Sequence, residues 1–70
     1  MNATIKVKDG STITVNNLRV IKRISTDNSS ITEENNFENF VLYNSPYIFV
    51  GSDIASINGH DIEYVFFYQD

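Results

Sequence analysis

Short alternating segments separated by turn signals constrain the fold of this chain more than any other feature of its sequence. Residues 4–8 and 12–15 alternate between β-branched and polar side chains, and Asp9-Gly10 between them is a typical hairpin turn. Helices are disfavoured because the chain has only two Leu and two Ala, against nine Ile, six Val and five Thr. The sequence therefore predicts an all-β fold.

The register of this first hairpin follows from its apolar residues. A two-residue loop would place the two apolar rows on opposite faces of the hairpin. A three-residue loop, Lys8-Asp9-Gly10, sets Ile5 opposite Ile13 and Ala3 opposite Val15, which produces one buried face. The glycine then takes the left-handed position of a bulge. We predict the three-residue loop.

A third strand is predicted over residues 18–25. Asn16-Asn17 shifts the alternation by one residue, which indicates a turn or a bulge. Lys22 then falls on the same face as the apolar residues Leu18 and Val20. Because an inward-leaning lysine discourages edge-to-edge pairing, we expect this strand at the edge of a sheet.

Residues 26–36 are polar, and we predict a loop there. A short helical turn near 31–40 is the alternative, since Ser30 and Glu33 match a capping box and Phe37 and Phe40 have helical spacing.

A second hairpin is predicted over residues 37–50, with Asn44-Ser45-Pro46 as its loop. A three-residue loop pairs apolar or aromatic side chains at every position, which is a favourable cross-strand arrangement. The predicted pairs are Tyr43 with Tyr47, Leu42 with Ile48, Val41 with Phe49, and Phe40 with Val50.

A third hairpin is predicted around Asn58-Gly59, after a break at Gly51-Ser52-Asp53. Asn-Gly is the strongest two-residue hairpin signal in the chain. It would pair Ile57 with His60 and Ala55 with Ile62, and the last strand would end with apolar residues on both faces.

Together these segments predict a small antiparallel sheet, sandwich or partly open barrel of SH3-like or Sm-like size, with six or seven short strands. Its 70 residues suit a single domain, and a chain of this length buries only about 60% of its unfolded surface. The absence of cysteine excludes disulfides and Cys-based zinc sites, and it favours a reducing compartment.

No membrane association is predicted from the sequence. The longest apolar run covers Tyr64 to Tyr68, whereas a spanning helix needs about 20 residues. The first residues lack the pattern of a signal peptide. We therefore expect a cytoplasmic protein.

Catalytic and cofactor motifs are scarce in this chain. It has neither a glycine-rich phosphate loop nor an EF-hand pattern, and its single imidazole belongs to His60. His60 with Asp61 or Glu63 would make a base and its orienting group, or one corner of a metal site; a histidine beside a turn is the more common arrangement. We predict no enzyme, no cofactor and no metal, with an enzyme using His60 as a distant third hypothesis.

Apolar residues on both faces of 40–50 and 64–68 exceed what one thin sheet can cover. The leading hypothesis is therefore a protein-interaction module that self-associates or docks onto a protein partner. The predicted contact residues are Phe40, Leu42, Tyr43, Tyr47, Phe49, Phe66, Phe67 and Tyr68.

Charge is divided unevenly along the chain. Residues 1–23 hold all five basic residues and one acid, for +4, and residues 24–70 hold eight acids, for −8, which sum to the net charge of −4. One interpretation is pairing between the two halves across one sheet. The other is an acidic, phage-type inhibitor that occupies the nucleic-acid-binding surface of a host enzyme through Asp27, Glu33, Glu34 and Glu38. Direct binding of nucleic acid is disfavoured, because no cations neighbour the aromatic residues in sequence.

Overall fold

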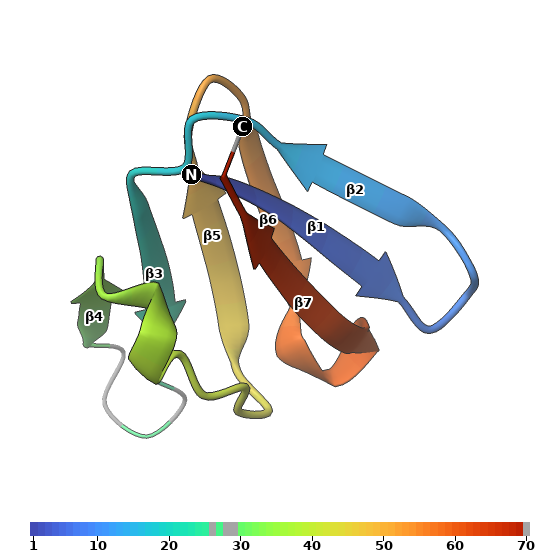
Figure 1. Cartoon of the computed structure of the whole chain (residues 1–70). Coiled ribbons are helices and arrows are strands. Elements are labelled where there is room, and N and C mark those ends of the chain that lie inside the picture. Colours follow the sequence, from blue (N-terminus) through green and yellow to red (C-terminus); the bar gives the residue numbers. More distant parts are fainter. Residues whose placement is uncertain (26, 28–29, 70) are drawn as a thin grey trace.

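Seven strands form two antiparallel sheets in the computed structural model, which describes residues 1–25, 27 and 30–69 (Figure 1). The first sheet has the order β2-β1-β7 and contains β1 (Asn2–Val7), β2 (Thr12–Val15) and β7 (Ile62–Tyr68). The second has the order β4-β3-β5-β6 and contains β3 (Val20–Ile24), β4 (Ile31–Glu34), β5 (Pro46–Val50) and β6 (Ile54–Asn58). Two 3-10 turns complete it, η1 (Phe37–Asn39) and η2 (Gly59–Asp61). The prediction of a small all-β sandwich or partly open barrel is confirmed.

The core lies between the inner faces of the two sheets. Its buried side chains come from alternate positions of the strands, as expected when one face of each sheet is covered. β1 and β5 contribute the most deeply buried residues, so each sheet is anchored by an interior strand. The core consists of Ala3, Ile5, Val7, Val15, Leu18, Ile21, Tyr47, Phe49 and Ile62.

The first hairpin has the predicted register. Ala3 pairs with Val15 and Ile5 with Ile13. The N–H of Val7 donates to the carbonyl oxygen of Ser11 at 2.9 Å and closes the three-residue loop. Gly10 adopts a φ of 97°, the left-handed conformation that a residue without Cβ takes most easily.

The side chain of Asp9 stabilises this loop. Its Oδ1 accepts hydrogen bonds from the hydroxyl of Ser11 at 2.6 Å and from the N–H of Ser11 at 2.8 Å. These two bonds favour the charged carboxylate and hold the pKa of Asp9 below its ordinary value of 3.8.

We expect an NMR titration to find the pKa of Asp9 below 3.8 and Ser11→Ala to raise it, since the hydroxyl makes the largest contribution. Because the pKa is lowered in the folded state, Asp9 stabilises the fold above its unfolded pKa. That contribution is lost as the pH falls through the folded pKa. Ser56→Ala, on the exposed side of β6, serves as the control and should leave the titration unchanged. An Asp9 pKa at or above 3.8 would contradict this account.

The strand after Asn16-Asn17 differs from its prediction. Asn17 has a φ of 54°, which confirms a turn at the phase shift. However, β3 lies between β4 and β5, so the prediction of an edge strand is wrong. Leu18 is buried before the strand begins, and its N–H donates to the carbonyl oxygen of Met1. The alternation within β3 therefore turns Ile21 inward, and Lys22 to the opposite face.

Residues 31–34 form a strand where the sequence predicted a loop. Ile31 pairs with Ile24 and Glu34 with Ile21, so β4 adds an outer strand to the second sheet. Thr26, Asn28 and Ser29, which the same prediction covered, lie outside the described residues. The alternative helical turn near 31–40 is confirmed as η1, but its N-cap is Asn36, and no side chain caps it.

The hairpin predicted over 37–50 is wrong. β5 pairs with β3 on one side and with β6 on the other, so Phe49 lies opposite both Ile21 and Ala55. Residues 40–45 form no strand and instead cross the open side of the core, where the Phe40 ring lies 5.6 Å from that of Tyr47. Because β3 and β6 occupy both edges of β5, no edge of β5 is left for residues 40–43 to pair with.

The hairpin predicted at Asn58-Gly59 is also wrong, and this segment is a corner between the sheets (Figure 1). The hairpin loop is Gly51–Asp53, which sets Val50 opposite Ile54. At the corner, the N–H of Gly59 donates to the carbonyl oxygen of Ser45 at 2.7 Å. The chain then continues through η2 into β7, which pairs with β1.

Candidate functional site

The eight predicted apolar contact residues fall into three groups. Tyr47 and Phe49 are buried in the core, where neither side chain is accessible to a partner. Their strand is covered on its inner face by the first sheet and by residues 37–43. Phe40 and Phe67 are half-buried and pack edge to face with ring centroids 5.5 Å apart. Of the remaining four, Leu42, Tyr43 and Phe66 are exposed, and Tyr68 is half-buried on the outer face of β7.

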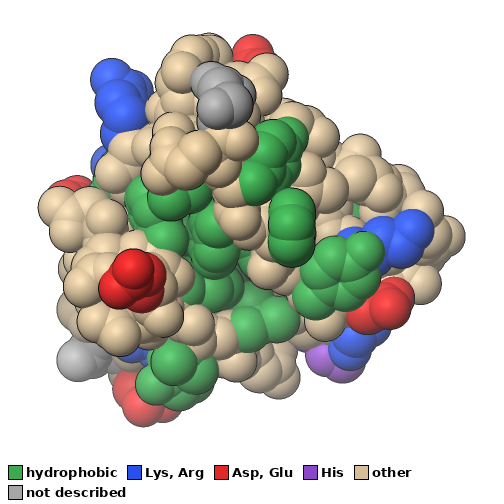
Figure 2. All heavy atoms as spheres, in the orientation of Figure 1, with side chains coloured by type: hydrophobic (Ala, Val, Ile, Leu, Met, Phe, Trp, Pro, Cys, Tyr) green, Lys and Arg blue, Asp and Glu red, His purple; other side chains and the backbone are tan. Residues whose placement is uncertain are grey.

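Three aromatic residues of β7 form an outward-facing row, which we call the outer aromatic row: Tyr64, Phe66 and Tyr68. Tyr64 is 52% exposed and Phe66 is 59% exposed, while Tyr68 is half-buried. The rings of Phe66 and Tyr68 stack with centroids 5.8 Å apart. Figure 2 shows apolar side chains gathered over β7 and in a hollow beside it.

The register explains why this row faces outward. Phe67 pairs with the buried Ala3 and therefore points inward, where it stacks against Phe37 at 5.3 Å. Its neighbours Phe66 and Tyr68 must point to the other face, because successive side chains of a strand alternate. The outer aromatic row therefore lies on the uncovered face of the first sheet, beside Thr4 and Lys6 of β1.

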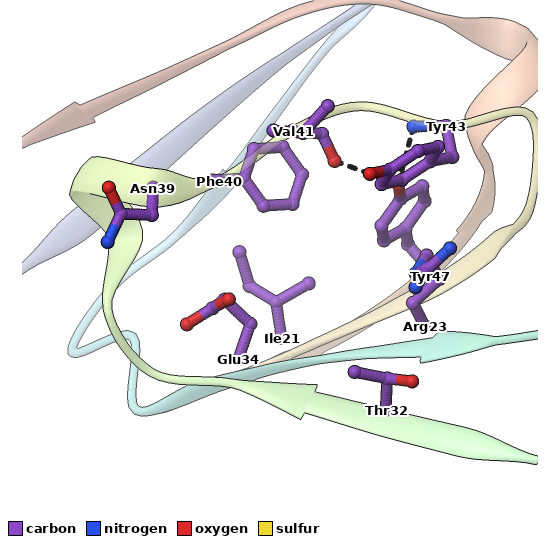
Figure 3. Close-up of a pocket in the computed structure, with 9 residues that line it drawn as sticks. All are labelled: Ile21, Arg23, Thr32, Glu34, Asn39, Phe40, Val41, Tyr43 and Tyr47. Carbon is purple, nitrogen blue, oxygen red and sulfur yellow. Dashed lines mark hydrogen bonds between the residues drawn. The ribbon is translucent and has the colours of Figure 1, made fainter.

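A pocket of about 160 Å³ lies between β3, β4 and residues 39–43 (Figure 3). Ile21 and Tyr47 provide buried apolar surface, and Phe40 closes the pocket from the opposite side. Polar groups surround this apolar interior. The full lining is Ile21, Arg23, Thr32, Glu34, Asn39, Phe40, Val41, Tyr43 and Tyr47.

The hydroxyl of Tyr47 binds the backbone of Val41 and Tyr43, which line one side of the pocket. It accepts a hydrogen bond from the N–H of Tyr43 at 2.6 Å and donates one to the carbonyl oxygen of Val41 at 3.2 Å. A buried core side chain thus satisfies two backbone groups of a segment without strand partners. These hydrogen bonds therefore attach residues 41–43 directly to β5, an interior strand of the second sheet.

Opposite charges occupy the two ends of this pocket. Arg23 lies at one end with Tyr43, its guanidinium carbon 4.4 Å from the centre of the Tyr43 ring, and Glu34 lies at the other end with Asn39 (Figure 3). Stacking on a ring leaves the N–H donors of a guanidinium available. Across the described residues, no hydrogen bond or ion pair involves the guanidinium of Arg23.

The four acidic residues of the alternative hypothesis do not share one face. Asp27, Glu33 and Glu38 are exposed, whereas Glu34 is half-buried in the pocket. Glu33 and Glu34 are adjacent in β4 and so point to opposite faces. The register also sets Lys22 opposite Glu33, which agrees with the interpretation that the basic half pairs with the acidic half.

His60 is exposed in η2, and its backbone N–H donates to the side-chain oxygen of Asn58 at 3.4 Å. Among the residues that the structure describes, no group of three or more His, Cys, Asp or Glu side chains could hold a metal ion. In that same part of the chain, no helix has the length and apolar character needed to cross a membrane.

Sequence reasoning missed most of the pocket and one residue of the outer aromatic row. Tyr64 could have been found, because it alternates with Phe66 and Tyr68. Arg23 could not, because its direction depends on where β3 begins and on which strands flank it. Comparison with protein-family models, with curated proteins and with solved structures finds no match.

Proposed function

We propose that the protein is a cytoplasmic, non-enzymatic interaction module that forms a weak homodimer through its outer aromatic row. The observation that supports this proposal is the exposure of Tyr64 and Phe66 on the uncovered face of a sheet. Contiguous aromatic surface of this kind marks an interaction site more often than scattered apolar residues do. The lack of cysteine suits a reducing cytoplasm.

A second copy of the chain suits this row because the order of residues is nearly symmetric about Phe66. A two-fold axis at Phe66 brings the two copies of Phe66 together and sets Tyr64 of each copy against Tyr68 of the other. Every one of these contacts is aromatic. The same axis sets Glu63 against Gln69, so no two carboxylates oppose each other. Two chains with a net charge of −4 each can approach through this uncharged row with little repulsion.

The size of the row sets the strength of the dimer. The exposed parts of two aromatic side chains amount to roughly 200 Å², well below the ~800 Å² per partner of a stable interface. We therefore expect a dissociation constant in the range of about 0.1–1 mM.

Sedimentation equilibrium from about 10 μM to about 1 mM tests the proposal in that range. We expect the average mass to rise from 8.0 kDa toward twice that value. Phe66→Thr should keep the protein monomeric, because it removes the central ring of the row. Ile54→Thr is the matched control, since Ile54 is 71% exposed on β6 and should leave association unchanged. A wild-type protein that stays monomeric throughout, or an equal effect of both variants, would overturn the homodimer.

A further inference from the structure

We propose that the pocket between β3, β4 and residues 39–43 binds a zwitterion whose carboxylate and ammonium groups are separated by a short apolar chain, an ω-amino acid. The inference rests on the pocket alone and is independent of the homodimer. It combines three features of the site: an apolar middle, an available guanidinium at one end and a carboxylate at the other.

The middle of the pocket suits a small apolar body. Its volume of about 160 Å³ is close to the ~150 Å³ of a cavity that holds one benzene ring. Ile21 and Tyr47 are each only 1% exposed, and the Phe40 ring lies across from them. A short methylene chain laid between these side chains would exclude water from both its own surface and theirs.

Arg23 suits the carboxylate of the ligand. A guanidinium presents its donors in a planar fork that matches the two oxygens of a carboxylate. Tyr43 stacks on the face of this fork, so its orientation is already restricted before a ligand arrives. Thr32 lies opposite Arg23 in the sheet register and offers a hydroxyl at the same end.

Glu34 suits the ammonium group of the ligand. Its Oε1 accepts a hydrogen bond from the N–H of Asn36 at 2.9 Å, which fixes the carboxylate and leaves its other oxygen available. Asn39 lines the same end of the pocket and can accept a further N–H (Figure 3).

The sheet register separates the two charges. Glu34 pairs with Ile21 and Thr32 pairs with Arg23, so Arg23 and Glu34 occupy diagonal positions with Ile21 beside them. Diagonal positions lie roughly 7–8 Å apart at the backbone. A ligand that satisfies both ends must therefore carry its charges apart, which excludes a simple α-amino acid such as glycine.

NMR titration of the full chain with a chain-length series tests the proposal. The probes are glycine, γ-aminobutyrate, δ-aminovalerate and ε-aminocaproate, with valerate and pentylamine as analogues that each lack one charge. We expect saturable shifts of backbone amides in β3 and β4 with δ-aminovalerate or ε-aminocaproate. Glycine, valerate and pentylamine should bind at least about tenfold more weakly, because each leaves a charged end of the pocket unpaired.

Four variants assign the two ends. Arg23→Gln and Glu34→Gln should each weaken binding of the best probe about tenfold, as expected for one lost charged hydrogen bond. Lys22→Gln and Glu33→Gln are the matched controls, because they remove the same charges from the opposite face of the same strands and should change nothing.

Titration of the wild-type chain alone can overturn the proposal. If the wild-type chain shows no saturable shifts up to about 10 mM, or if valerate or pentylamine binds as tightly as δ-aminovalerate, the site does not recognise a zwitterion. Nα-acetyllysine distinguishes two sources of the same chemistry. Tighter binding of this probe than of ε-aminocaproate identifies the carboxyl-terminal lysine of a peptide, and weaker binding identifies a free ω-amino acid.

Discussion

Replacing Gly59 with alanine is expected to destabilise the protein by about 3 kcal/mol, a large part of the roughly 4–10 kcal/mol that holds a chain of this length folded. A Cβ at this position would collide with the carbonyl oxygen of Tyr43 and would lie 2.7 Å from that of Ser45 and 2.8 Å from Cε2 of Tyr47. Two of these atoms belong to the backbone and cannot move aside as a flexible side chain would. Urea denaturation of the variant measures the loss.

Gly10→Ala is the control for this prediction. Gly10 has a φ of 97°, but a Cβ there would meet no atom within 4 Å. The cost is then limited to backbone strain, roughly 1–2 kcal/mol. The account of the corner between the sheets fails if Gly59→Ala proves as stable as Gly10→Ala.

The second large effect is expected for Phe49→Ala, which should cost about 3–5 kcal/mol, a large part of the stability of the chain, and strongly lower its melting temperature. Phe49 is fully buried on the central strand β5, with the rings of Tyr47 and Phe40 at 6.2 and 6.4 Å. Truncation would open a cavity in a core of few side chains. Thermal unfolding followed by circular dichroism measures the change.

Phe66→Ala makes the same chemical change at a side chain that is 59% exposed. We expect it to cost less than about 1 kcal/mol, since most of the ring already contacts water. Equal melting temperatures for the two variants would show that the core does not lie between the two sheets as described.

The first hairpin could be predicted in full because all its determinants are local. The three-residue loop, the position of Gly10 and the pairing of Ile5 with Ile13 follow from alternation and turn geometry within 15 residues. The later segments could not be predicted in this way. Asn58-Gly59 carries a strong hairpin signal, but the N–H of Gly59 bonds to Ser45, and that contact depends on tertiary structure.

In the candidate site too, features with local determinants could be predicted, and features that depend on tertiary structure could not. The outer aromatic row could be predicted for Phe66 and Tyr68, because strict alternation along one strand assigns their face. The pocket could not, since Arg23 and Glu34 come together only after β4 pairs with β3. The sequence predicted a loop for Ile31–Glu34, because its polar residues favour exposed structure and its pairing partner lies outside the segment.

The pairing of β1 with β7 also bears on how the chain folds. Asn2 lies opposite Tyr68, so the first and last strands lie side by side (Figure 1). Closing such a distant pair costs more chain entropy than closing any of the local hairpins, so it belongs late in folding. A chain that has folded only as far as β6 therefore lacks the third strand of its first sheet. Until β7 pairs with β1, the hairpin of β1 and β2 keeps one unpaired edge.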